Sequence, residues 1–226
     1  MKPSILFLVH RIPFPPNKGD KIRSFHMLRY LAQRYRVHLA TFVDDPDDWQ
    51  YVSQVETLCA DLCAVKLHRT SAKVRSLSGL WLGEPLSLSY YKNQKLQKWI
   101  RRKVSTESLD AILVFSSTMA QYIDWQKPGL PRTVVDFVDM DSEKWRQFAQ
   151  SKHGLWKRLF TREADTLAVF ETATATAAAA GLFVSAEEAA SFRERSGLKE
   201  DKIIAVAQGD DDLGVGLQRH DRVEHG

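Results

Sequence analysis

The chain has 226 residues, of which 44% are hydrophobic and 27% are charged, and its formal net charge is +4. This composition is that of a globular protein with room for one large domain or two small ones, and so mild a charge does not by itself indicate nucleic-acid binding. No stretch has the length of a membrane span or the layout of a signal peptide, so we expect a cytoplasmic protein, or one resting peripherally on the inner face of the membrane.

The first predicted elements form a strand–helix–strand unit. The run ILFLV (5–9) is short, continuous and apolar, which is typical of a strand buried on both faces. Apolar residues then recur at helical spacing after an expected N-cap at Asp20, and VHLATFV (37–43) predicts a second buried strand. So short a connection between two buried strands indicates a parallel βαβ unit.

The same alternation continues along the chain. Helices are expected over 48–59, 71–80, 91–104, 155–179 and 186–195, and strands over 64–67, 110–115, 133–138, 181–185 and 202–206. We expect Gly181 to stop the alanine-rich end of the long helix, and Cys59 and Cys63 to be inert thiols on one helix face. The pattern predicts a Rossmann-like α/β domain over 1–206, with a mainly parallel sheet flanked by helices, and an irregular, disordered tail over 207–226.

The segment HRIPFPPNKGDKIRSFH (10–26) follows the first strand and is unusual. Its prolines stiffen an extended segment, Gly19 allows a positive φ, and Lys18, Lys21 and Arg23 surround the unpaired N–H groups of the next helix. These residues predict an anion site for a diphosphate or an acidic sugar, although a rigid connector with solvated lysines explains them equally well. Neither a dinucleotide-binding GxGxxG nor a P-loop pattern is present.

Polar side chains follow several of the predicted strands, where ligands bind in an open parallel sheet. His10 and Arg11 follow the first strand, Ser116 and Ser117 follow another, and VVDFVDMDSEKW (134–145) places three aspartates near a third strand end. Carboxylates accept hydrogen bonds from sugar hydroxyls, and an indole face can stack on a sugar ring. The alternatives are a local helix cap at Asp141 or Ser142 with a Lys144 ion pair, or a metal site built from the aspartates.

Three stretches resemble the N-terminal half of a family-4 glycosyltransferase, and most of all the sugar transferases associated with the PEP-CTERM/exosortase exopolysaccharide system. They are HRIPFPPNKGDKIRSFHMLRYLA (10–32), VVDFVDMDSEKW (134–145) and LFVSAEEAASFR (182–193). The resemblance implies the GT-B architecture, in which an acceptor-side domain faces a second domain that holds a nucleotide-sugar donor. It implies retaining hexosyl transfer without a cofactor or a bound metal.

The strand-end pattern and the resemblance together give one set of candidate site residues. His10 is the candidate catalytic group. The candidate substrate-binding residues are Arg11, Lys18, Gly19, Asp20, Lys21, Ser116, Ser117, Asp136, Asp139, Asp141, Lys144 and Trp145. If Gly19 has a positive φ, its replacement by Val should cost more than an ordinary surface substitution.

The sequence after KIIAV (202–206) lacks the turn that leads into a donor domain in the resembled family. We therefore expect a truncated acceptor-side domain that does not transfer sugar alone. The expected partners are a glycan or lipid-linked acceptor and, through a missing C-terminal domain, a nucleotide-sugar donor, with no nucleic acid. A non-catalytic saccharide- or nucleotide-binding module and an inactive remnant remain alternatives.

Two basic stretches with interleaved aromatic residues, 92–103 and 144–162, raise the question of membrane contact. Basic amphipathic helices bind anionic bilayers, which would suit an enzyme with a lipid-linked acceptor. The alternative is that their aromatic residues pack into the core beneath a solvated charged face.

Overall fold

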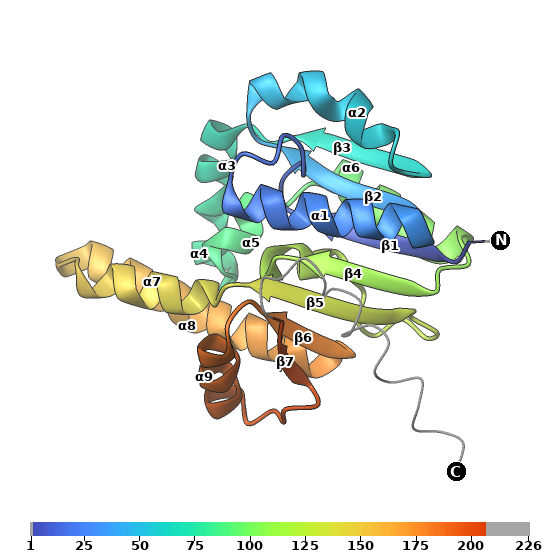
Figure 1. Cartoon of the computed structure of the whole chain (residues 1–226). Coiled ribbons are helices and arrows are strands. Elements are labelled where there is room, and N and C mark those ends of the chain that lie inside the picture. The colour runs from blue at the N-terminus through green and yellow to red at the C-terminus, as the bar shows by residue number, and fades with distance from the viewer. Residues whose placement is uncertain (1, 207–226) are drawn as a thin grey trace, which may run out of the picture.

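The computed structural model describes residues 2–206, and the expected disordered tail over 207–226 lies outside the described residues. Seven strands form one sheet in the order β3-β2-β1-β4-β5-β6-β7, and every neighbouring pair is parallel (Figure 1). The predicted parallel, Rossmann-like α/β fold is therefore confirmed. The strands are β1 (Ser4–Val9), β2 (Arg36–Val43), β3 (Asp61–Lys66), β4 (Ala111–Phe115), β5 (Arg132–Val138), β6 (Ala180–Phe183) and β7 (Ile203–Ala205).

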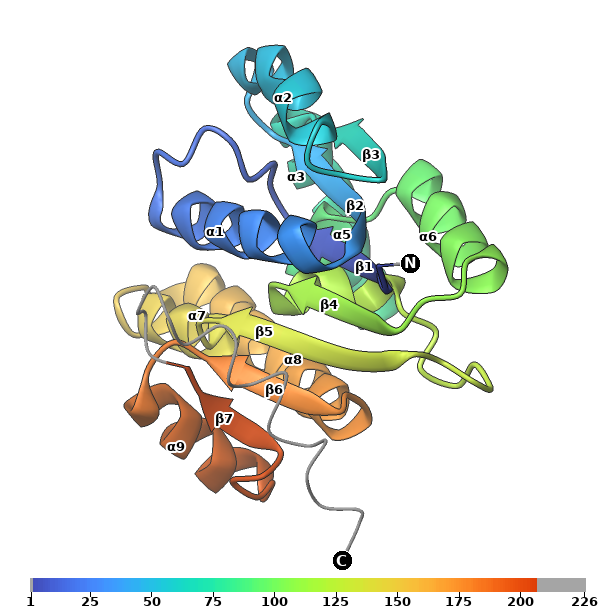
Figure 2. The ribbon, with the colours of Figure 1, turned by 45° about the vertical axis from the view of Figure 1, so that its right-hand side comes forward.

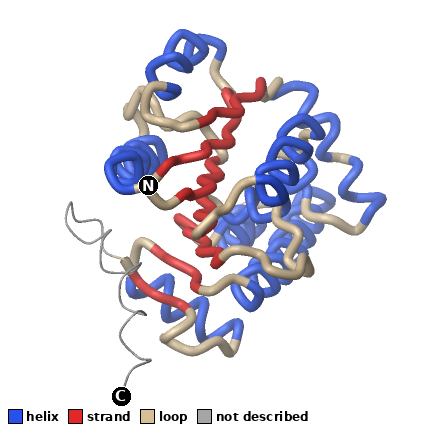
Figure 3. Tube along the Cα trace, turned by 90° about the vertical axis from the view of Figure 1, so that its right-hand side faces the viewer, coloured by secondary structure: helices blue, strands red, loops and turns tan. Residues whose placement is uncertain are grey.

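Helices cover both faces of this sheet (Figure 3). One apolar cluster joins the sheet to α1 (Gly19–Arg34) and α2 (Val52–Glu56). A second cluster, on the other face, joins it to the remaining elements that reach the core. These are α3 (Arg69–Ser76), α6 (Gln94–Thr106), the 3-10 helix η2 (Ser117–Tyr122), α8 (Gly154–Ala177) and α9 (Ala186–Ser196). All six residues of β1 are buried, as expected of a central strand covered on both faces.

The order of the strands determines where a ligand can enter. From β1 the chain builds outward through β2 to β3, and it then returns to β4 on the other side of β1 before building outward to β7. The reversal leaves a crevice beyond the carboxyl ends of β1 and β4, which is where open α/β sheets bind ligands. In Figure 1 this edge lies on the left, where α1 begins and where α7 (Asp141–Gln150) extends outward.

Several elements are shorter than predicted. The expected helix over 48–59 is a 3-10 helix η1 (Pro46–Tyr51) followed by α2, because Asp45 caps a tight turn with Pro46 in first position. Cys59 follows α2 and Cys63 lies in β3, so the prediction that the two thiols share one helix face was wrong. Burial raises the pKa of the Cys59 thiol to about 12, which keeps it unreactive. In place of the two helices expected over 71–80 and 91–104, the structure has four: α3, α4 (Ser78–Leu82), α5 (Leu86–Tyr90) and α6.

Three predicted positions differ in detail. The residue before α1 is Lys18, so Asp20 lies inside the first turn and does not cap the helix as predicted. Gly181 does not stop α8 as predicted, because α8 already ends at Ala177 and Gly181 lies within β6. Gly19 does not have a positive φ, and a Cβ placed on it would meet no atom within 4 Å. The conformational reason for a large Gly19→Val penalty is therefore absent.

One buried ion pair joins the two halves of the sheet. The guanidinium of Arg23, on α1, donates from Nε and Nη2 to Oδ2 of Asp136 on β5, at 3.1 and 2.8 Å. Both side chains are buried, and the other carboxylate oxygen accepts the backbone N–H of Val138 at 2.9 Å. Burial raises the pKa of Asp136, and the Arg23 cation acts against this. The pair fixes α1 against the strand that leads into the crevice.

We expect Asp136→Ala to lower the free energy of unfolding by about 3–5 kcal/mol, because it leaves the Arg23 cation buried without its partner. Urea unfolding followed by circular dichroism measures this. The double variant Arg23→Met/Asp136→Leu should lose less than the sum of the single variants. The matched control is Asp165→Ala at the exposed pair with Arg146, where a loss of about 0–1 kcal/mol is expected. Equal losses at the two aspartates would contradict the importance of the buried pair.

A pair of glycine substitutions tests the packing of the sheet. A Cβ on Gly181 would lie 3.0 Å from Cε2 of Phe137 and 3.1 Å from Cδ1 of Ile203, so Gly181→Ala should destabilise the protein by about 1–3 kcal/mol. Gly19→Ala faces open space in a helical backbone and should be neutral or slightly stabilising. Thermal unfolding of the two variants beside the parent protein checks this, and a larger loss at Gly19 would show that the expectation is wrong.

Candidate functional site

A hollow of about 350 Å³ lies at the carboxyl ends of β1, β4 and β5, which is a suitable size for a small ligand. It is mostly polar at its walls. Its lining comes from the ends of these strands, from η2 and from the starts of α1 and α7, together with the α5 region. The lining residues are His10, Arg11, Asp20, Ser87, Tyr91, Ser116, Thr118, Phe137, Val138, Asp139, Asp141, Lys144 and Trp145.

One wall of the hollow is an ionic cluster around Asp20. Its carboxylate Oδ2 lies 3.2 Å from Nε2 of His10 and 3.2 Å from Nη1 of Arg11. The hydrogen bond from His10, with the nearby Arg11 charge, holds the pKa of Asp20 well below its usual value. Arg11 also lies 3.3 Å from Asp44, at the end of β2. The cluster therefore presents a fixed carboxylate and a half-exposed guanidinium to the hollow.

Two aromatic rings and Asp20 fix the orientation of the His10 ring. The ring stacks on Phe115 with the centroids 5.9 Å apart and meets the ring of Tyr91 edge-on at 6.1 Å. Nε2 faces Asp20, and Nδ1 is buried without a hydrogen-bond partner among the described residues. His10 thus orients Asp20 in this structure, and its role as a catalytic group stays a prediction.

The opposite wall is the start of α7. Lys144 pairs with Asp139 and lies 3.8 Å from Asp141, whose Oδ2 accepts a hydrogen bond from Ser117. Desolvation raises the pKa of Asp141 although about a third of its side chain is exposed, and the Lys144 cation acts against this shift. Burial alone would lower the pKa of Lys144, but the hydrogen bond to Asp139 and the charge of Asp141 raise it. This wall combines two carboxylates with one firmly charged ammonium group.

The backbone is strained at two positions of the hollow. Ser116 has a φ of 81° and Val138 a φ of 67°, and no other non-glycine residue in the described part of the chain has a positive φ. Such a conformation costs a β-branched residue most, and strain of this kind clusters at functional sites. The register between β5 and β6 shifts at this point, which turns the chain toward Asp139.

Sequence reasoning missed the contribution of α5. Glu163, buried on α8, accepts the backbone N–H groups of Leu86 and Ser87 and the hydroxyl of Ser87, which fixes α5 beside the hollow. Tyr91 follows α5, and its carbonyl accepts a hydrogen bond from Tyr122. No sequence signal marks these residues, because their place depends on a partner 76 residues away. Thr118 is different: it follows Ser116 and Ser117 closely enough to have been included.

The structure brings eight of the predicted site residues to the hollow, where their role in binding stays a prediction. They are His10, Arg11, Asp20, Ser116, Asp139, Asp141, Lys144 and Trp145. The remaining five lie elsewhere.

Lys18 and Gly19 are exposed and do not line the hollow. Lys21 is buried in an ion pair with Asp48 at 2.6 Å, and Asp136 is buried in the pair with Arg23. Ser117 is also buried and reaches the hollow only through its hydrogen bond to Asp141. The structure therefore contradicts the predicted anion site around the start of α1, because the side chains of Lys21 and Arg23 are buried in ion pairs.

The aspartates near β5 do not gather into a metal site. Asp136 turns inward to Arg23, and Asp139 pairs with Lys144. Within residues 2–206, no group of three or more His, Cys, Asp or Glu side chains is placed to hold a metal ion.

Comparison with known proteins supports the fold. No protein-family profile and no curated protein sequence matches the chain. Among solved structures, it is similar to the N-terminal domain of trehalose-6-phosphate phosphatase from Candida albicans, with a TM-score of 0.47 and 12% identity over 87% of this chain and 43% of that one. It is also similar to TcCGT1 in complex with UDP, with a TM-score of 0.50 and 12% identity over 92% of this chain and 51% of that one. The chain thus spans about half the length of either structure.

Two substitutions on α7 should shift the pKa of Asp141 in opposite directions. Lys144→Met removes a cation that favours the ionised form of Asp141 and should raise the pKa of that carboxyl further. Asp139→Asn removes a like charge and should lower it. Carbon-detected NMR titration of the aspartate carboxyl groups measures both shifts. Shifts of the same sign in the two variants would contradict the arrangement.

Proposed function

We propose that the chain forms the acceptor-side half of a GT-B glycosyltransferase, which transfers a sugar from a nucleotide-sugar donor to a glycan or lipid-linked acceptor in exopolysaccharide synthesis. The observation that carries the proposal is the polar hollow at the strand-order reversal, where carboxylates, a lysine and an indole converge. The fold shared with TcCGT1, a protein solved in complex with UDP, supports it.

The residues of the hollow suit a saccharide. Asp139 and Asp141 offer acceptor oxygens for sugar hydroxyls, and Ser116 and Thr118 add hydroxyl groups that can donate or accept. Trp145 is half-buried and held by the ring of Phe160, with the centroids 5.2 Å apart, which keeps its indole in a fixed position for packing against a sugar ring. The carboxylates are fixed by Lys144 and Ser117, so little ordering is needed when a ligand binds.

In the proposed reaction this half of the enzyme positions the acceptor. The attacking hydroxyl would be held by the Asp139 and Asp141 side of the hollow, while the departing nucleotide diphosphate develops charge on the donor side. Arg11 is the half-exposed cation of the hollow that can approach this charge. Rate enhancement would come from positioning and electrostatics, with His10 acting through Asp20.

A non-catalytic saccharide- or nucleotide-binding module is the second candidate. The observation that favours it is that residues of this chain alone line the hollow. The two candidates share the ligand class and differ in turnover.

Ligand-observed NMR tests the shared part of the proposal. We expect the chain to bind alkyl glycosides such as octyl glucoside or octyl mannoside, with UDP-glucose and GDP-mannose as donor probes. Asp139→Asn and Trp145→Ala should each weaken glycoside binding at least about fivefold, because each removes a direct contact. Trp49→Ala, at a partly exposed tryptophan on η1 outside the hollow, is the matched control.

Turnover separates the two candidates. Because the acceptor-side half is not expected to transfer sugar alone, the chain is incubated together with a separately expressed GT-B donor-side domain, labelled nucleotide sugars and glycoside acceptors. A labelled product is expected for the transferase half, and binding without product for a binding module. Absence of any glycoside or nucleotide binding, or binding that survives both Asp139→Asn and Trp145→Ala, would contradict both candidates.

A further inference from the structure

Two helical segments expose large apolar side chains near the edge of the sheet that carries the hollow. The first is α3–α4, with Val74, Leu77, Leu80 and Trp81; Trp81 is 92% exposed. The second is the hairpin of α7 and α8, which pack side by side (Figure 2) and extend away from the sheet (Figure 1). It exposes Phe148, Leu155 and Trp156. We call these seven side chains the apolar tip. Most of the large apolar side chains exposed within the described residues belong to it.

The parts of these segments that carry the apolar tip are basic. No Asp or Glu occurs over 62–83 or over 144–162. Lys152, Lys157 and Arg158 are exposed and form no ion pair with any described residue, in contrast to Lys144 and Arg146 at the base of α7. The cations nearest the apolar tip are therefore available to an external anion.

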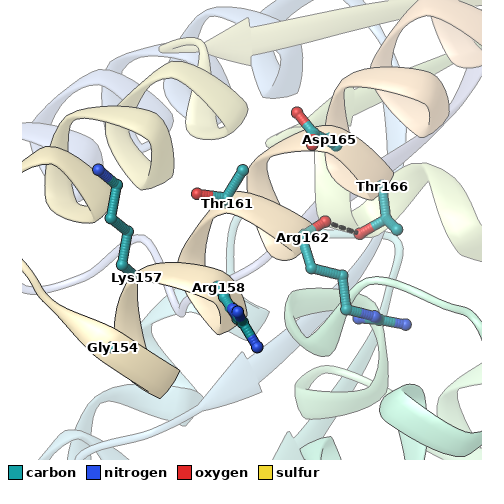
Figure 4. Close-up of a pocket in the computed structure, with 7 residues that line it drawn as sticks. All are labelled: Gly154, Lys157, Arg158, Thr161, Arg162, Asp165 and Thr166. Atoms are coloured by element: carbon teal, nitrogen blue, oxygen red, sulfur yellow. Dashed lines mark hydrogen bonds between the residues drawn. The ribbon is translucent and has the colours of Figure 1, made fainter.

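An open, shallow hollow of about 630 Å³ along α8 adds a basic surface (Figure 4). Lys157, Arg158 and Arg162 contribute to its lining, and its one acidic residue, Asp165, is paired with Arg146. Arg162 donates to the carbonyls of Gly79 and Glu84, so α8 and the α4–α5 turn are in direct contact at this point. The two halves of the apolar tip thus belong to neighbouring segments joined through Arg162.

The other basic stretch does not have this character. In α6, Leu96 and Ile100 are buried in the core, Trp99 packs against it, and Lys103 lies 2.7 Å from Asp61. The alternative of core packing therefore describes residues 94–106. Within the described residues no helix is long and apolar enough to cross a bilayer.

We propose that the apolar tip and its cations bind the surface of an anionic lipid bilayer. Exposed tryptophans beside lysines and arginines match the membrane–water interface, where aromatic rings lie at headgroup level and cations meet anionic headgroups. The basic hollow beside α8 is large enough for a phosphate-bearing headgroup. Because the tip lies at the same edge of the sheet as the candidate site, a bound membrane would bring an amphiphilic molecule close to that site. The proposal does not depend on sugar transfer.

Vesicle flotation with the full chain tests this proposal. We expect flotation with vesicles of phosphatidylcholine containing about one third phosphatidylglycerol, weak flotation with pure phosphatidylcholine, and weakening by salt. Lys157→Glu/Arg158→Glu should reduce partitioning at least about tenfold, because each reversal replaces attraction by repulsion. Lys98→Glu/Arg101→Glu makes the same charge change on the exposed face of α6 and should leave flotation unchanged. Circular dichroism establishes that both double variants are folded.

Quenching by brominated lipid locates the contact. Trp81→Phe and Trp156→Phe keep an apolar ring, so each should still float while losing part of the quenching of tryptophan fluorescence. Trp49→Phe should leave the quenching unchanged, since η1 lies outside the apolar tip.

Three results would overturn the proposal. They are absence of flotation with anionic vesicles, equal losses in the α8 and α6 charge variants, and quenching that persists unchanged without Trp81 and Trp156. Tight, salt-sensitive binding of single-stranded RNA through Lys157 and Arg158, without vesicle binding, would assign the surface to nucleic acid instead.

Discussion

The buried pair of Arg23 and Asp136 is the constraint on which the candidate site depends. It joins α1, which carries Asp20 toward the hollow, to β5, which leads to Asp139 and α7. The same carboxylate accepts the N–H of Val138 and so supports the strained turn at the end of β5. The two charged walls of the hollow, one around Asp20 and one around Lys144, are thereby held by the same buried pair.

Much of the framework follows from local sequence patterns. Continuous apolar runs mark buried parallel strands because both sheet faces are covered, and polar residues that follow such strands must gather at one edge. This is why His10, Ser116 and Asp139 meet, although more than 100 residues separate the first from the others. Most of the predicted residues that reach the hollow lie within three residues of a strand end, namely His10, Arg11, Ser116, Asp139 and Asp141, whereas the other three come from the helices α1 and α7.

Other features depend on partners that the sequence cannot reveal. Lys21 and Arg23 have the spacing of a basic helix start, and only the fold shows that Asp48 and Asp136 neutralise them. Likewise, Tyr91 enters the hollow because Glu163 anchors α5 from a distant helix. The prediction that Gly181 ends α8 was wrong for a related reason. Gly181 lies within β6, where the side chains of Phe137 and Ile203 pack tightly against it.

Glu163 and Arg162 are adjacent on α8, and both bind the α4–α5 region that forms part of the wall of the hollow. With 24 residues, α8 is a stiff rod about 36 Å long, and its exposed end lies two turns before this attachment. Because α8 is continuous from Gly154 to Glu163, a displacement of its exposed end would also displace α5 and Tyr91. The outer α7–α8 hairpin and the α5 side of the hollow are therefore expected to move together.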